Sequence, residues 1–173
     1  WLETAVGRLD SNDAFTVLFF HDDEVLETPP LGLKPGQRRN QARALDWMTP
    51  ENGNVRPRGK SHPLAALRQA ASYHPTEVVL LSDDNFGRRS DDDVNPQSIA
   101  AALQPAADAT KRNADSDADP DAATLPVVNT IQFFYEDDDH RLENLARFFG
   151  GHYRFIEEPP FEAQPAADIL LGG

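Results

Sequence analysis

The sequence of 173 residues contains no cysteine and only one methionine. The absence of cysteine excludes disulfide bonds and thiolate metal sites. No apolar run approaches the roughly 20 residues that a membrane-spanning helix needs. Basic residues are also few, because 16 lysines and arginines stand against 29 acidic residues, for a net charge of −13. This charge argues against a surface that binds nucleic-acid phosphates or anionic lipids, and favours cations or basic partners.

Motifs typical of enzymes are missing as well. Ser82 is not part of a Gly-x-Ser-x-Gly nucleophile elbow, and Gly150 and Gly151 do not form a Gly-x-Gly-x-x-Gly phosphate loop. The five histidines are scattered, without the His-x-x-x-His spacing of a helical zinc site. We therefore expect a protein without enzymatic activity.

Apolar, β-branched runs alternate with segments of helical periodicity along the chain. Strands are predicted at residues 14–20, 77–82, 127–135 and 153–156, with a short edge strand at 25–26. Helices are predicted at 1–9, 37–48, 61–71, 96–103 and 140–149. This alternation indicates an α/β fold, a doubly wound and mostly parallel sheet with helices on both faces.

The expected domain covers residues 1–156. Residues 105–125 are rich in alanine and aspartate and have few large apolar side chains, so we expect a flexible acidic insert there. Residues 157–173 are predicted to be a C-terminal tail.

The most informative stretch runs from Gly59 to Phe86 and predicts a loop, a helix, a buried strand and an acidic loop. Ser61 is a candidate N-cap of the helix. Asp83 and Asp84 follow the strand at 77–82, which we expect to be covered on both faces. In open parallel sheets, ligands bind beyond the carboxyl ends of the strands. Asp83, with Ser61 in a neighbouring loop, is therefore the first candidate for binding chemistry.

Four segments, in this order, resemble the von Willebrand factor type A (VWA) domain in its bacterial form: DAFTVLFFHDD, GKSHPLAALRQA, PTEVVLLSDDNF and LARFFGGHYRFI. The segment VVNTIQFF stands where a further strand of the family is expected. The resemblance covers about residues 1–156. It implies a doubly wound fold that binds protein ligands.

Many VWA domains bind a divalent cation, Mg²⁺ or else Mn²⁺ or Ca²⁺. The family's site combines an Asp-x-Ser-x-Ser loop after the first strand, a threonine before a later helix and an aspartate after the fourth strand. The resemblance places Ser61 at the threonine and Asp83 at the second aspartate. The first strand with its Asp-x-Ser-x-Ser loop is absent from this chain, and His62 and Asp84 depart from the family pattern. The metal site is therefore incomplete, and a degenerate site would hold no cation.

The resemblance thus predicts a protein-interaction module that binds at the carboxyl edge of the sheet, assisted by a cation if an upstream segment completes the site. Its partner-binding residues would be Asp22, His62, Asp84 and Asp137. One alternative is a degenerate, metal-free structural subunit of an assembly. A weaker one is a metal-dependent hydrolase or phosphoryl-transfer domain that uses Asp83 and Asp84. A segment upstream of Trp1 could anchor the protein to a membrane, with an extracytoplasmic location.

The family's first strand lies at the centre of the sheet. Without it, the strands at 14–20 and 77–82 have no partner between them, and unpaired strand edges are costly to bury. We therefore expect an upstream strand, or one from another chain, to fill this place.

A chain extended upstream of Trp1 should consequently unfold at a higher temperature, and associate less with itself, than residues 1–173 alone. Thermal unfolding and sedimentation velocity of the two chains test this expectation. A short form that is monomeric and as stable as the extended one would contradict it.

Overall fold

The computed structural model describes residues 2–22, 24–56, 62–83, 95–104, 125–134 and 140–157. Its N-terminal half contains short elements: α1 (Leu2–Gly7), β1 (Ala14–Phe15), β2 (Leu18–His21), β3 (Glu24–Glu27), β4 (Lys34–Pro35), α2 (Arg38–Met48) and the 3₁₀ helix η1 (Pro50–Asn52). None of the described helices combines the length and apolar character needed to span a bilayer.

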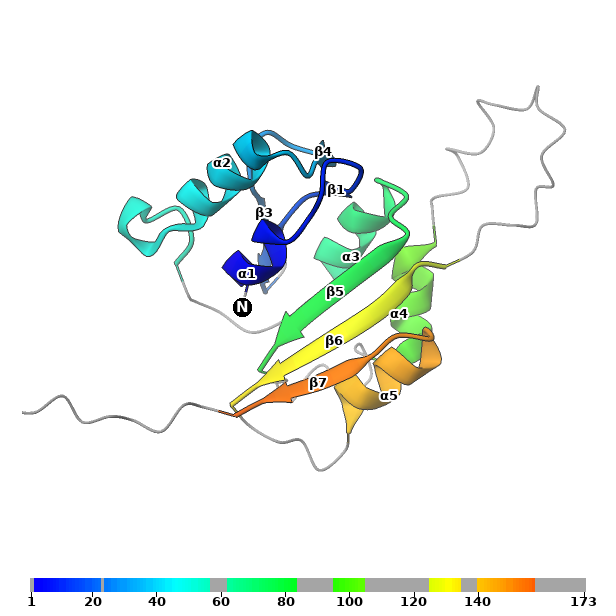
Figure 1. Ribbon diagram of the computed structural model, residues 1–173. Coiled ribbons are helices and arrows are strands. Elements are labelled where there is room, and N and C mark those ends of the chain that lie inside the picture. Colours follow the sequence, from blue (N-terminus) through cyan, green and yellow to red (C-terminus); the bar gives the residue numbers. More distant parts are fainter. Residues whose placement is uncertain are drawn as a thin grey trace, which may run out of the picture.

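The second half alternates helices and strands: α3 (Leu64–Ala71), β5 (Glu77–Ser82), α4 (Pro96–Leu103), β6 (Val127–Phe133), α5 (Arg141–Phe148) and β7 (Tyr153–Ile156). β5, β6 and β7 form a parallel sheet in that order, and their arrows point the same way in Figure 1. The predicted α/β class with a parallel sheet is confirmed. The strands at 77–82 and 153–156 and the helix at 96–103 have the predicted bounds.

The sequence around α4 shows why that helix was easy to locate. Asn95 and Ser98 form a capping box, in which the Ser98 N–H donates to Asn95 Oδ1 at 2.8 Å and the Asn95 N–H donates to Ser98 Oγ at 3.1 Å. Pro96 occupies the first turn, where its missing N–H has no helical partner to lose. The apolar residues that follow at helical spacing are buried.

The hydrophobic core lies between the parallel sheet and three helices. Leu80 of β5 and Val128 of β6 share one face of the sheet and belong to a single buried cluster with residues of α3, α4 and α5, among them Leu67, Ile99 and Leu142. Thr130 is fully buried on the same face, and its hydroxyl donates to the carbonyl oxygen of Leu142 at 2.8 Å. These contacts fix the three helices against one side of the sheet.

The opposite face is more open in the described part of the chain. Val79 of β5 points to that face and is 49% exposed. The expectation that strand 77–82 is covered on both faces is therefore wrong for this residue. An apolar run does not reveal which of its alternate residues meets a neighbour, because that depends on elements distant in sequence.

The N-terminal strands differ from the sequence prediction. The single strand expected at 14–20 is two strands, because β1 pairs with β4 and β2 pairs with β3, both antiparallel. Between them, Thr16 and Val17 leave the ladder of β1, and the Val17 carbonyl accepts the Thr28 N–H at 3.0 Å. β4 lies in a stretch rich in proline and glycine, where no strand was predicted. Continuous β propensity thus did not reveal that the chain changes partners within the run.

The buried residues of α2 are Gln41 and Ala44, whereas the neighbouring Ala42 is exposed. The buried amide of Gln41 is satisfied, because Nε2 donates to the carbonyl oxygens of Leu9 and Gly36 at 2.7 and 2.8 Å. A polar side chain is therefore what ties α2 to the loops beside it.

The carboxylate of Glu27, at the end of β3, joins the N-terminal strands to α3. Its Oε1 accepts hydrogen bonds from the Thr16 hydroxyl at 2.8 Å and from the Gly32 N–H. Its Oε2 accepts from Gln69 Nε2 and from the Tyr73 hydroxyl, both at 2.7 Å. Burial acts to raise the pKa of Glu27, but these four hydrogen bonds outweigh it and hold the pKa below the ordinary value of 4.5.

The substitution Glu27→Gln should lower the free energy of unfolding by about 1–3 kcal/mol, because a neutral amide offers one acceptor oxygen in place of two charged ones. Glu51→Gln, at an exposed position in η1, is the matched control and should change stability little. Urea unfolding at pH 7 measures both.

The same variant has a pH signature. Because the folded pKa is lowered, the contribution of Glu27 is fully present above about pH 4.5 and is lost as pH falls through the folded pKa. The stability gap between wild type and Glu27→Gln should consequently shrink at pH 3. A gap of equal size at both pH values would show that the carboxylate charge is not the cause.

Candidate functional site

The carboxyl ends of the parallel strands meet at one edge of the sheet, which we call the carboxyl edge. Asp83 follows β5 directly and Phe134 follows β6. Only a short connection separates the end of α3 from the start of β5, so α3 runs antiparallel to β5 and begins at the carboxyl edge. His62 lies just before α3, and His140 just before α5, which joins β6 to β7. The topology therefore brings His62, Asp83, Phe134 and His140 to the same edge.

The residues predicted for cation and partner binding are only partly brought together. His62 and Asp83 come to the carboxyl edge, whereas Asp22 lies in the turn of the β2–β3 hairpin, which forms a separate sheet. There, the half-buried ring of His21 approaches Glu24 with Nε2 at 3.2 Å and Asp22 with Nδ1 at 3.9 Å.

Three of the predicted site residues, Ser61, Asp84 and Asp137, fall outside the described part of the chain. Ser61 was expected to be the N-cap of its helix, but Pro63 holds that position in α3, without a side-chain cap.

A divalent cation needs several oxygen ligands at once. Among the described residues, no group of three or more histidines, aspartates and glutamates is placed to hold a metal ion. Asp83 is the only described member of the predicted Ser61–Asp83 pair. The described side chains therefore do not fit a cation site by themselves.

Sequence reasoning missed Phe134. The run at 127–135 was expected to be strand throughout, but β6 ends at Phe133, and Phe134 turns out of it with φ +69°. Its side chain is 51% exposed, with its ring centroid 6.1 Å from that of Phe133. A bulky residue at positive φ is unusual and costs free energy. His140, across the same loop, also has a positive φ, of 50°. Strained residues of this kind concentrate at functional sites.

Buried polar side chains lie in the sheet next to its carboxyl edge. Ser82 and Gln132 are register partners on adjacent strands, one residue before Asp83 and two before Phe134 respectively. Both are almost fully buried, and the Tyr153 hydroxyl donates to Gln132 Oε1 at 2.9 Å. The hydrogen bond between Gln132 and Tyr153 therefore joins β6, near its carboxyl end, to the first residue of β7.

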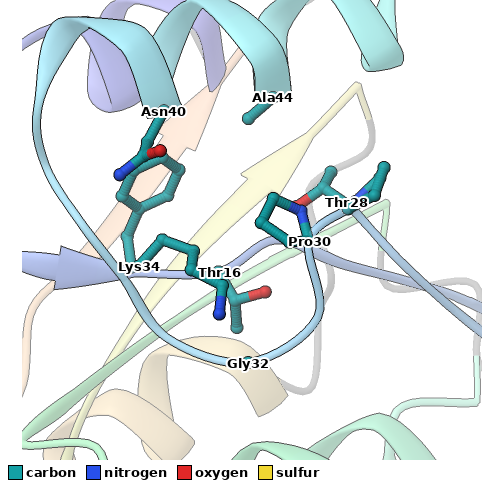
Figure 2. A pocket seen from close by; sticks show the side chains of 9 residues that line it. Thr16, Thr28, Pro30, Gly32, Lys34, Asn40 and Ala44 are labelled. Atoms are coloured by element: carbon teal, nitrogen blue, oxygen red, sulfur yellow. The ribbon is translucent and has the colours of Figure 1, made fainter.

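The hollow in Figure 2 lies elsewhere, between α2 and the loop through Gly32. It has a volume of about 210 Å³, part of which is open solvent. Its walls are formed by Phe15, Thr16, Thr28, Pro29, Pro30, Gly32, Lys34, Asn40 and Ala44, so no residue of the carboxyl edge lines it. We do not assign it to the site.

Comparison with known proteins identifies the fold. No family model matches the sequence, and no curated protein matches it. Among solved structures, the chain is similar to a von Willebrand factor type A protein from Catenulispora acidiphila, with a TM-score of 0.61 over 91% of this chain and 15% sequence identity. The chain spans about a third, 33%, of the length of that protein. The VWA-type fold expected from the four sequence segments is confirmed.

The strain at Phe134 can be tested directly. Phe134→Gly should leave the free energy of unfolding unchanged or raise it by up to about 1 kcal/mol, because glycine adopts positive φ without steric cost. At an exposed phenylalanine with negative φ, the same substitution would lower the free energy of unfolding, because glycine gains more conformational freedom in the unfolded chain. Urea unfolding measures the change, and a loss above 1 kcal/mol would show that the ring serves the fold.

Proposed function

We propose that this chain, which has a VWA-type fold, is a protein-interaction module that binds its partner at the carboxyl edge. The observation that carries the proposal is Phe134, an exposed aromatic residue held at positive φ at the same edge of the sheet as Asp83. Aromatic side chains dominate the energetics of protein interfaces. Loops on a rigid scaffold are also where binding residues concentrate.

The chemistry of the edge suggests the kind of partner. The net charge of −13 and the aspartates of these loops favour a basic surface around an apolar spot that receives Phe134. In the proposal, Asp83 and His62 lie next to this anchor. Asp22, Asp84 and Asp137 contribute negative charge that speeds association.

The proposal does not require a cation, because the described side chains do not form a cation cage. Mg²⁺ dependence would instead indicate that Ser61 and an upstream Asp-x-Ser-x-Ser loop complete the site with Asp83.

An immobilised chain should retain partner proteins from an extract of the source organism, and Phe134→Ala should weaken this retention by about 30-fold or more, the effect of losing about 2 kcal/mol of binding. Phe148→Ala is the matched control. Phe148 is 54% exposed but lies at the end of α5, away from the carboxyl edge.

Asp83→Asn should weaken the same interaction and reduce its dependence on salt. Equal losses for Phe134→Ala and Phe148→Ala would contradict the proposed site. Repeating the measurement with EDTA separates direct binding from cation-assisted binding, because only the second is lost.

A further inference from the structure

Helix α2 and the chain just before it carry positive charge in an otherwise acidic protein. Between Glu27 and Asp46 the sequence contains four basic residues and no acidic one, whereas the whole chain has a net charge of −13. The four basic residues are Lys34, Arg38, Arg39 and Arg43. Figure 1 shows α2 on the outside of the N-terminal half, away from β6 and β7.

The three arginines of α2 share one side of the helix, and all are exposed. The buried residues Gln41 and Ala44 lie on the other side. With 3.6 residues per turn, the arginines fall within about 140° of one another around the helix axis. We call the surface formed by Arg38, Arg39 and Arg43 the arginine face.

No acidic side chain neutralises the arginine face within the described part of the chain. Its three arginines form no ion pair and no side-chain hydrogen bond there. The carboxylates of Asp10 and Asp13, in the turn before β1, accept backbone N–H groups of that same turn. Asp46, three residues after Arg43, forms no ion pair with it. The positive charge is therefore available to a binding partner.

The arginines do not stabilise the helix that carries them. Arg38 and Arg39 occupy the first turn of α2, where the helix dipole favours negative charge over positive charge. Arg39 and Arg43 are one turn apart and repel each other. The N-cap residue, Gln37, makes no side-chain hydrogen bond that would compensate. Residues that break a local rule of stability are expected at functional sites, so the arginine face is better explained by binding than by folding.

Polar contacts hold α2 in a fixed place. At its start, the amides of Asn40 and Gln41 donate to backbone carbonyl oxygens of the preceding loops. At its end, the amides of Asn52 and Asn54 donate to carbonyl oxygens of its last turn. Lys34 lines the same hollow as Asn40 (Figure 2) and adds a fourth positive charge beside the first turn. A helix fixed at both ends loses little conformational freedom when it binds.

We propose that the arginine face binds an extended acidic segment of a partner polypeptide through its aspartate or glutamate carboxylates. Guanidinium groups match carboxylates in geometry and bind them through two parallel hydrogen bonds. Alternate side chains of an extended segment are about 6.6 Å apart, close to the roughly 6 Å rise between Arg39 and Arg43. One segment with carboxylates at alternate positions can thus engage both arginines.

A polypeptide fits this surface better than a nucleic acid does. The arginine face spans only about 8 Å along the helix. Beyond it, a chain with a net charge of −13 repels a long polyanion. Screening limits this repulsion to about 8 Å at physiological salt, so a short acidic segment is still attracted by the local charge. This surface shares no residue with the carboxyl edge and does not depend on the function proposed there.

The probe is a synthetic fluorescent peptide, Ser-Glu-Ala-Glu-Ala-Glu-Ser, whose binding to residues 1–173 is measured by anisotropy and by NMR titration. The NMR shift changes at saturation should centre on the backbone amides of residues 38–43. Binding should weaken as the NaCl concentration rises from about 50 mM to about 300 mM. A peptide with glutamine in place of each glutamate is the control and should not bind.

Arg39→Glu should weaken peptide binding by about tenfold or more, because it replaces a guanidinium with a second carboxylate. The same variant should raise Tm by about 1–3 °C, because negative charge in the first turn favours the helix. A purely structural residue would not combine weaker binding with higher stability. Arg68→Glu, at an exposed position on α3, makes the same change of charge and should leave binding within about twofold of wild type.

Four results would overturn the proposal. Equal losses for Arg39→Glu and Arg68→Glu would show that the peptide responds only to net charge. Shift changes centred outside residues 34–43 would place the peptide elsewhere. A single-stranded oligonucleotide of equal charge that binds more tightly than the peptide, and is lost in Arg39→Glu, would identify a nucleic acid as the ligand. Changes of the same signals with protein concentration, without peptide, would identify a second copy of the chain as the occupant.

Discussion

The carboxylate of Glu27 is the interaction on which the arrangement of the two halves depends. The β2–β3 hairpin shares no ladder with the parallel sheet in the described chain. Glu27 nevertheless joins the hairpin to α3, because it accepts hydrogen bonds from Gln69 in α3 and from Tyr73 just after it. It accepts two more from Thr16 and Gly32. Burial and the hydrogen bond to Glu27 in turn raise the pKa of Tyr73. At pH 7 the carboxylate of Glu27 is therefore charged and the phenol of Tyr73 is neutral.

Helix α3 transmits this constraint to the rest of the molecule. Gln69 and Tyr73, within and just after α3, hold the N-terminal strands, while Leu64 and Leu67 pack in the core with Leu80 of β5. The first turn of the helix, beside His62, thereby has a defined place at the carboxyl edge.

Sequence patterns predicted the second half of the chain well, for local reasons. The capping box at Asn95 and Ser98 fixes where α4 begins, and β5 is a short apolar run bounded by Pro75 and Asp83. The strands of the first half were harder to predict. Thr16 and Val17 have strand propensity, but the Thr16 hydroxyl donates to Glu27 and the Val17 carbonyl accepts from the Thr28 N–H, so they do not continue the ladder of β1. Asp83 could be placed at a strand end from sequence, whereas Phe134 could not be distinguished from one more strand residue.

The sequence by itself determined the α/β class, the order of the elements and the presence of aspartates after strands, because propensity, periodicity and capping act over a few neighbouring residues. Only the tertiary structure decided which strands pair, which face of α2 is buried and where β6 ends, because these depend on contacts between residues far apart in the chain. Glu27 reaches Gln69 across 42 positions, and no local pattern in EVLE indicates that partner. The exposure of Val79 and the positive φ of Phe134 likewise depend on which residues from distant parts of the chain lie next to them.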